Sequence, residues 1–372
     1  MLKTEQQSLY ELALFSLEGI GAVTAKTLIS YLGGIEQVFK ATRSELMKVP
    51  GIGEKRVEEI ISQESVKRAE SLLVKLQKYD IGYHFYLDKN FPRRLLQIDS
   101  CPIVLFVQGD LDLNRSRMIS IVGTRSPSQR GALFCEQLID QLAGMDVCIL
   151  SGLAYGIDTI AHKKALELEI PTVGVLGSGM DRIYPSSNRD LALKMSKGGA
   201  VLTEFAFGVK PDRENFPKRN RIIAAMCDAL IVIESARKGG SIITAEYANE
   251  FSKDVFAVPG RVSDVMSEGC NLLIKGHKAH MLESVKDLEY ILRWDKRPVQ
   301  KQLHFPDMLS KDEKEIYEAI ADKNEIALDQ LVYGSKMSLS RLSSILLNLE
   351  IRGLVKCKPG RKYILASRSR VY

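Results

Sequence analysis

Residues 210–221, Lys-Pro-Asp-Arg-Glu-Asn-Phe-Pro-Lys-Arg-Asn-Arg, crowd cations around a single aromatic ring. Cationic side chains neutralise phosphates, an aromatic face stacks on a base, and an amide hydrogen-bonds to either group. This composition is typical of a contact with single-stranded nucleic acid. The candidate contacts are Arg213, Phe216, Lys218, Arg219, Asn220 and Arg221. An alternative stays open, namely a solvated loop before a helix, with Phe216 as a hydrophobic plug and Pro217 in the first helical turn.

The elements that would position this segment are buried strands. Apolar, β-branched runs alternate with helical patterns between residues 115 and 290, at 118–122, 147–150, 172–176, 200–203, 230–233 and 255–258. Such runs predict a parallel sheet covered on both faces, the doubly wound, Rossmann-like α/β class. Ligands of these sheets bind beyond the carboxyl ends of the strands. The cationic segment follows the run at 200–203, so we expect it at that functional edge.

Two further strand ends carry residue types that suit phosphates. Arg125 follows the first run and offers a bidentate phosphate clamp. The candidates Lys238, Gly240, Ser241 and Thr244 lie where a helix should begin, and its free N–H groups would favour an anion. The first turn lacks the Gly-x-Gly-x-x-Gly pattern of dinucleotide cofactors, and 238–241 lacks the order of a Walker loop. We therefore expect no cofactor and a row of several phosphates.

The regions on either side of the sheet are small modules. Residues 17–26 and 49–58 each read as helix, Gly-Ile-Gly turn and helix, which resembles a tandem helix-hairpin-helix motif. Helical patterns at 312–321, 327–333 and 338–350, followed by two strands around a basic Pro-Gly turn, resemble a winged helix. Its third helix would expose Ser338, Ser340, Arg341, Ser344 and Asn348. Both modules could bind DNA or protein. The expected domains are 1–83, 84–294 and 311–372, with a linker at 295–310.

The overall composition and charge of the chain limit the classes of function that it can have. The 372 residues are 45% hydrophobic with a formal charge of +6, and no apolar run has membrane-spanning length. The cysteines are scattered without a Cys-x-x-Cys pair, so we expect a reducing cytoplasm and no structural zinc. After Glu350 the chain carries only basic charges, which predicts a basic surface. They are Arg352, Lys356, Lys358, Arg361, Lys362, Arg368 and Arg370.

Other residues with catalytic potential have plainer interpretations. Asp158 and His162 lie one helical turn apart and could form an acid/base pair, but we expect Asp158 to cap the helix and hold a loop while His162 packs. His277 and His280 have no third ligand nearby, so we expect no metal. One of Arg219 and Arg221 could pair with a strand-end acid such as Glu204 or Glu234 instead of touching DNA.

Six ordered motifs together resemble one family, DNA processing protein A (DprA/Smf). They are Ser120-Ile-Val-Gly-Thr-Arg125, Ser151-Gly-Leu-Ala-Tyr-Gly-Ile-Asp158, Gly177-Ser-Gly-Met-Asp-Arg-Ile-Tyr-Pro185, Phe216-Pro-Lys-Arg-Asn-Arg-Ile-Ile223, Gly240-Ser-Ile-Ile-Thr-Ala245 and Ala257-Val-Pro-Gly260. The chain departs from the family at Arg130-Gly131, where Tyr-Gly is common.

The resemblance implies a homodimeric recombination mediator that is not an enzyme. Such a protein binds single-stranded DNA, protects incoming DNA during natural transformation and loads the RecA recombinase, with single-strand-binding protein as a further candidate partner. The alternative is a Rossmann-like nucleotide phosphoribohydrolase, whose signature Pro-Gly-Gly-x-Gly-Thr-x-x-Glu is only partly matched by Lys238-Gly-Gly-Ser-Ile-Ile-Thr-Ala-Glu246.

Overall fold

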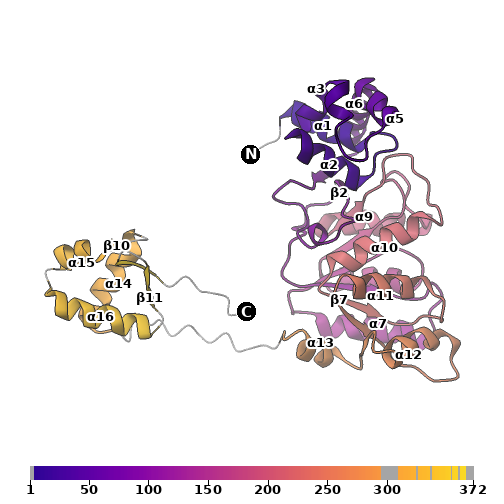
Figure 1. The fold of residues 1–372 in the computed structure, drawn as a ribbon. Helices are drawn as coiled ribbons and strands as arrows, with labels where there is room; N and C mark the ends of the chain where they lie inside the picture. Colours follow the sequence, from indigo (N-terminus) through magenta and orange to yellow (C-terminus); the bar gives the residue numbers. More distant parts are fainter. Residues whose placement is uncertain are drawn as a thin grey trace. The chain divides into compact units, whose positions relative to one another are not determined.

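The computed structural model describes residues 4–294, 309–323, 326–335, 337–352, 354–358 and 361–365. The chain divides into two compact units, Met1–Trp294 and Asp295–Tyr372 (Figure 1). The first unit contains a helical module and a large sheet, and the second unit is a small α/β module.

The sheet of the first unit is mostly parallel, as the sequence predicted. Its nine strands follow the order β1-β2-β6-β5-β4-β3-β7-β8-β9. All neighbours from β6 to β9 in that order pair in parallel, whereas β1 with β2 and β2 with β6 are antiparallel. The strands are β1 (Gly82–Phe85), β2 (Val104–Gln108), β3 (Met118–Val122), β4 (Cys148–Ser151), β5 (Thr172–Val175), β6 (Ala200–Thr203), β7 (Ala229–Val232), β8 (Asp254–Ala257) and β9 (His280–Met281).

Alternate residues of each central strand enter opposite cores. On β3, Met118 and Val122 pack into one hydrophobic cluster, and Ile119 and Ile121 pack into another. The first cluster is covered by α10 (Asn215–Met226), α11 (Gly240–Glu250) and α12 (Glu268–Lys275), and the second by α7 (Gln129–Leu142), α8 (Ile157–Glu167) and α13 (Val285–Ile291). Helix α9 (Arg189–Gly198) packs against β5 and β6. Short 3-10 turns lie at Leu95–Gln97, Ser186–Asn188 and Val265–Ser267.

The helical module stands at one end of the sheet (Figure 1, indigo). It comprises α1 (Glu5–Phe15), α2 (Ala22–Leu32), α3 (Ile35–Lys40), α4 (Arg43–Leu46), α5 (Glu54–Ile61) and α6 (Glu64–Lys78). Its two hairpin turns contain Gly19 and Gly51, both with positive φ, which explains glycine there. Arg56 donates from Nε to the carbonyl oxygen of Gly19 at 2.9 Å and from Nη1 to that of Gly51. One guanidinium thus ties the two hairpins together.

The second unit has the elements of a winged helix. They are α14 (Lys311–Lys323), β10 (Ile326–Ala327), α15 (Leu328–Ser335), α16 (Leu339–Ile351), β11 (Val355–Lys358) and β12 (Lys362–Leu365), with the sheet order β10-β12-β11. Helix α16 buries Leu342, Ile345, Leu346 and Leu349. The five polar residues expected on its outer face are exposed, and Arg341 forms an ion pair with Asp312.

Several sequence predictions fall outside the described residues. These are most of the linker (295–308), the Pro359-Gly360 turn, and Arg368 and Arg370. The boundary expected at residue 83 lies within β1 and stays a prediction. In the parts of the chain that the structure describes, no helix is both long and apolar enough to cross a bilayer.

Candidate nucleic-acid interface

The candidate site is a cavity of about 470 Å³ at the carboxyl ends of β3 and β7. The chain runs outward from β3 through β4, β5 and β6, then returns to place β7 on the other side of β3. The loops after β3 and β7 diverge at such a reversal and leave a crevice. The predicted residues that line this crevice are Arg125, Arg213, Phe216, Arg219, Asn220, Gly240, Ser241 and Thr244. Lys218, Arg221 and Lys238 are not in its lining.

Phe216 lies at the centre of the cationic groups. Its ring centroid is 5.3 Å from Cζ of Arg125 and 5.9 Å from Cζ of Arg219. It also lies near Gly177, where an added Cβ would come within 3.1 Å of Phe216 Cδ1. Gly177 therefore lets the ring pack against the loop after β5. The side chain is partly buried and also lines the cavity.

Arg219 is almost entirely buried, with 4% of its surface exposed. Its Nη1 donates to the carbonyl oxygens of Gly152 and Val175, and its Nε donates to Oδ1 of Asn220 at 3.1 Å. Burial lowers the pKa of the guanidinium to about 10, and the nearby Asp158 carboxylate opposes that shift. Arg219 thus remains charged at neutral pH and fixes the ends of two strands beneath the cavity.

Asp158 holds the loop after β4. Its Oδ2 accepts hydrogen bonds from the backbone N–H groups of Gly152 at 3.0 Å and Ala154 at 3.4 Å. The expectation that Asp158 holds a loop is confirmed, but the expectation that it caps α8 is wrong, because Gly156 is the N-cap. Burial raises the pKa of Asp158, and the charge of Arg219 opposes this. His162 packs in the core as expected, with its Nδ1 2.7 Å from the Thr172 hydroxyl.

The N-terminus of α11 supplies backbone donors to the cavity. Its N-cap is Gly239, and no side chain caps the helix. The first N–H groups of a helix lack internal partners and carry partial positive charge, which suits an anion. Asn220 Nδ2 donates to the carbonyl oxygen of Gly240 at 3.4 Å and so links α10 to this helix. An added Cβ on Gly240 would meet nothing within 4 Å, so there is open space beside Gly240 at the start of the helix.

Arg221 has a different environment from the one predicted for a phosphate contact. It forms an ion pair with Glu204, and both side chains are about 85% buried, since 14% and 15% of their surfaces are exposed. The sequence analysis allowed for an ion pair between this arginine and a strand-end acid in place of a DNA contact, and the structure contains that ion pair. Lys218 and Lys238 are exposed, and each directly precedes in sequence a residue that lines the cavity, Arg219 and Gly239 respectively. Their roles as DNA contacts stay predictions.

Two residues near the site were missed by sequence reasoning. The Tyr184 ring lies 5.9 Å from that of Phe216 and is 43% exposed, and Met266 lines the cavity. Tyr184 belongs to the motif at 177–185, and membership of that motif could have identified it as a site residue. Met266 follows β8 with no distinguishing pattern around it. Among the described residues, no group of His, Cys, Asp and Glu has the arrangement of a metal site.

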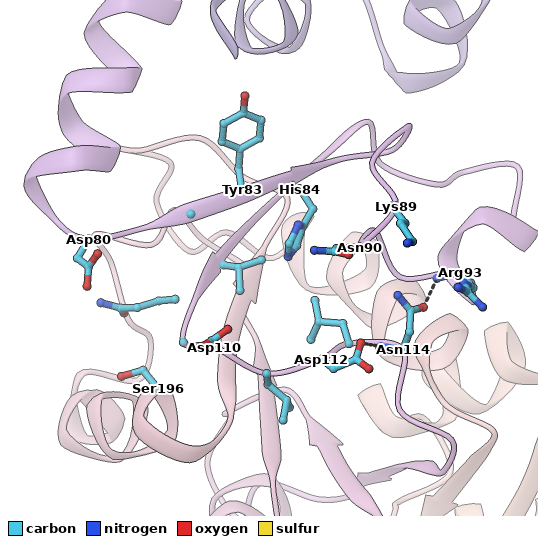
Figure 2. A pocket seen from close by; sticks show the side chains of 16 residues that line it. Asp80, Tyr83, His84, Lys89, Asn90, Arg93, Asp110, Asp112, Asn114 and Ser196 are labelled. Carbon is cyan, nitrogen blue, oxygen red and sulfur yellow. Dashed lines mark hydrogen bonds between the residues drawn. The ribbon is translucent and has the colours of Figure 1, made fainter. Parts of the chain in front are cut away.

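A larger hollow of about 900 Å³ lies at the antiparallel edge of the sheet, beside β1 and β2 (Figure 2). Acids and bases are mixed in its lining, which includes Asp80, Asp110 and Asp112 as well as Lys89 and Arg93. Carboxylates repel phosphates, so this hollow is a poor anion site. The cavity between β3 and β7 has one acid among its described lining residues, Asp158, which is occupied by backbone N–H groups.

Comparison with known proteins places this geometry in a family. Residues 82–292 match the family described as DNA recombination-mediator protein A, residues 11–63 match a SAM-like helix-hairpin-helix tandem, and residues 305–361 match the DprA winged helix domain. The protein Smf of Synechocystis sp. is 34% identical over 98% of this chain and 99% of its own length. The DNA processing protein DprA of Streptococcus pneumoniae is 42% identical over 51% of this chain and 67% of its own length.

Solved structures agree. DprA from Streptococcus pneumoniae superposes with a TM-score of 0.66 at 32% identity, covering 78% of this chain and 98% of that one. DprA from Helicobacter pylori, whose structure concerns its single-stranded DNA binding mode, superposes with a TM-score of 0.52 at 27% identity, covering 57% of this chain and 95% of that one. Because the model of this family matches residues 82–292, more than half of the chain, and a relative 34% identical covers nearly all of it, the chain belongs to the DNA recombination-mediator protein A (DprA/Smf) family.

Proposed function

We propose that the protein binds single-stranded DNA in the cavity between β3 and β7. The observation that carries this proposal is the meeting of three elements in one crevice. These are the exposed Arg125, the Phe216 ring and the uncapped N-terminus of α11. Cations and helix N–H groups bind successive phosphates, and an aromatic ring stacks on a base of any sequence. The solved relative from Helicobacter pylori with its single-stranded DNA binding mode supports the same choice.

The cellular role we propose follows the family. The protein protects incoming DNA during natural transformation and loads RecA recombinase onto it, acting in the cytoplasm as a homodimer. RecA loading is tested by strand exchange on DNA coated with single-strand-binding protein. Addition of this protein should relieve the inhibition caused by the coat. Light scattering of the full chain tests the dimer, because a mass of one chain would exclude it.

An enzymatic role has little support from the cavity. The signature glutamate of phosphoribohydrolases would correspond to Glu246, which is exposed and absent from the cavity lining. The acid that does line the cavity, Asp158, accepts two backbone hydrogen bonds and holds a loop. We therefore propose that the protein is a binder rather than a hydrolase. Release of free base from a nucleoside monophosphate would overturn this.

The central experiment compares single-stranded with double-stranded oligonucleotides by gel shift and fluorescence anisotropy. The full chain and a chain ending near residue 300 are both tested, because the break between the two compact units lies at Trp294. We expect both chains to prefer the single strand and to lose affinity steeply with salt. Equal affinity for both forms of DNA, or loss of binding on truncation, would contradict a site between β3 and β7.

A further inference from the structure

A third hollow of the first unit lies between α6 and the loop that follows β6. Its volume is about 530 Å³, and one wall is formed by Ala206 and Phe207. These residues belong to the same loop, 204–214, that carries Arg213 to the central cavity. The opposite wall includes Lys67, Arg68, Ser71 and Lys75 of α6. We call this hollow the α6 groove.

The charge of the α6 groove is positive toward the C-terminus of α6. Arg68 forms ion pairs with Glu59 and Glu18, and Lys67 forms one with Glu64 at 2.7 Å. Lys75 forms no ion pair with any residue that the structure describes. One helical turn further, Lys78 Nζ lies 5.5 Å from the centroid of the Tyr79 ring. The two cations at this end of the helix are therefore available to an anion.

An aromatic platform adjoins these cations. The rings of Tyr79 and Phe207 are stacked with centroids 5.9 Å apart and an interplanar angle of 29°. Tyr79 is 51% exposed, so part of its surface faces solvent. A lysine beside an exposed aromatic ring repeats the combination of Arg125 and Phe216 in the central cavity. That combination binds the backbone and a base of a single strand.

The loop between the two sites is anchored in place. The N–H of Gly179 donates to the carbonyl oxygen of Val209 at 3.0 Å, and the N–H of Gly208 donates to Asp181 at 2.9 Å. Arg213 is six positions after Phe207, so their Cα atoms are at most about 22 Å apart. A strand of several nucleotides covers such a distance, within the range of roughly 4–16 nucleotides known for single-strand sites. The exposed Lys210 lies between the two ends of the loop.

We propose that single-stranded DNA leaving the central cavity follows the 207–213 loop onto α6. There, Lys75 and Lys78 contact phosphates and Tyr79 stacks on a base. The helical module thus extends the binding surface of the sheet through α6 rather than through its hairpin turns. The second turn is followed by the exposed Glu54. Glu18, which adjoins the first turn, also lines the α6 groove, where it forms an ion pair with Arg68. This inference rests on the proposed function of the central cavity.

The test combines two variants with two lengths of DNA. In the full chain, Lys75→Ala with Lys78→Ala removes the two cations, and Lys163→Ala with Lys194→Ala removes two exposed lysines on α8 and α9 as the matched control. Oligo-dT of about 6 nucleotides should occupy the central cavity alone, whereas about 20 nucleotides should also reach α6. Affinity is measured by anisotropy over a range of salt concentrations.

We expect the α6 variant to bind the long oligonucleotide severalfold more weakly and the short one unchanged. The slope of log affinity against log salt for the long oligonucleotide should fall by about 1.4, since each lost phosphate contact contributes about 0.7. The control variant should match the parent protein at both lengths. An unchanged affinity for the long oligonucleotide, or an equal loss at both lengths, would overturn the proposal. Failure of the parent protein to bind either length would instead refute the proposed function.

Tyr79 provides a second test that does not depend on charge. Tyr79→Phe keeps the ring and should keep the affinity for the long oligonucleotide. Tyr79→Leu retains an apolar contact to Phe207 but removes the stacking face. It should therefore weaken binding of the long oligonucleotide and leave binding of the short one unchanged. Equal binding by both variants would show that the ring merely packs between the module and the loop.

Discussion

The guanidinium of Arg219 lies 5.9 Å from the centroid of the Phe216 ring and is buried beneath it. From that position it donates to the carbonyl oxygens of Gly152 and Val175, at the ends of β4 and β5. The ring of Phe216 therefore rests on a cation that also fixes the strand ends. The same ring is approached by the exposed Arg125 from the loop after β3. One arginine supports the site and the other is free to meet a ligand.

This difference predicts that substitution of Arg219 lowers the stability of the fold, whereas substitution of Arg125 lowers the affinity for DNA. Arg219→Met should lower the free energy of unfolding by about 3 kcal/mol, because it leaves buried carbonyl oxygens without donors and Asp158 without its compensating charge. Arg125→Ala should change stability by less than about 0.5 kcal/mol, as is usual for exposed positions. Instead it should weaken oligo-dT binding and reduce the salt slope by about 0.7.

Urea denaturation and anisotropy on the same preparations separate these outcomes. Because phosphate contacts do not distinguish between bases, Arg125→Ala should lower the affinity for oligonucleotides of every sequence by the same factor. A sequence-dependent loss for Arg125→Ala, or an Arg219→Met variant as stable as the parent, would show that the two roles are misassigned.

Phe216 should contribute by stacking. Phe216→Ala is expected to weaken oligo-dT binding by about 1 to 3 kcal/mol, the range measured for single aromatic platforms. Phe216→Leu preserves an apolar side chain over Arg219 and Gly177 but has no ring face. If stacking is the main contribution, Leu should bind as weakly as Ala. If Leu binds like the parent protein, then Phe216 is a hydrophobic plug, as the alternative interpretation of the sequence held.

Gly240 tests the N-terminus of α11 without removing any side chain. Its added Cβ would meet nothing within 4 Å, so Gly240→Ala should leave stability unchanged or raise it slightly. A phosphate at the helix N-terminus would, however, collide with that methyl group, and we expect affinity for oligo-dT to fall severalfold. Gly198→Ala on α9 is the matched control, because its Cβ also has open space. Equal affinities for the two variants would place the phosphate elsewhere.

The sequence predicted the strands well where they are buried on both faces. The runs 118–122 and 200–203 have the bounds of β3 and β6, and each of the other four runs differs from its strand by no more than one residue at either end. The edge strand β1 was not predicted, because Gly82–Phe85 contains only one buried residue and has no apolar run. Its partner β2 is apolar but pairs with β6 in an antiparallel sense, which depends on contacts distant in the sequence.

The sequence predicted which segments form the site, but it did not predict the role of each residue within a segment. Lys218, Arg219 and Arg221 lie in one short stretch of α10, and only their helical phase decides which is buried. Arg219 faces the strand ends, Arg221 faces Glu204, and Lys218 faces solvent. The sequence alone leaves that phase open, because the start of α10 has no side-chain cap to mark it.

His162 gives the fold a dependence on pH that can be measured apart from DNA binding. The side chain is fully buried on α8, and the Thr172 hydroxyl donates to the Ile149 carbonyl oxygen at 3.0 Å. The hydroxyl oxygen therefore accepts from Nδ1 of His162, which leaves Nε2 as a buried nitrogen without a partner. Burial, assisted by the charge of Arg219, lowers the pKa of His162 to about 3. A proton on this ring would have no partner at Nε2.

We therefore expect stability to fall as the solution is acidified. Below the ordinary histidine pKa of about 6.5, the unfolded chain binds a proton that the folded chain rejects until the pH approaches its own lower pKa. Between pH 7 and pH 5 this difference should cost the folded state about 2 kcal/mol. His162→Gln retains a donor toward Thr172 but cannot be protonated, so its free energy of unfolding should lose this component. The exposed His277→Asn variant should keep the pH dependence of the parent protein, and an equally steep dependence in His162→Gln would show that other groups cause it.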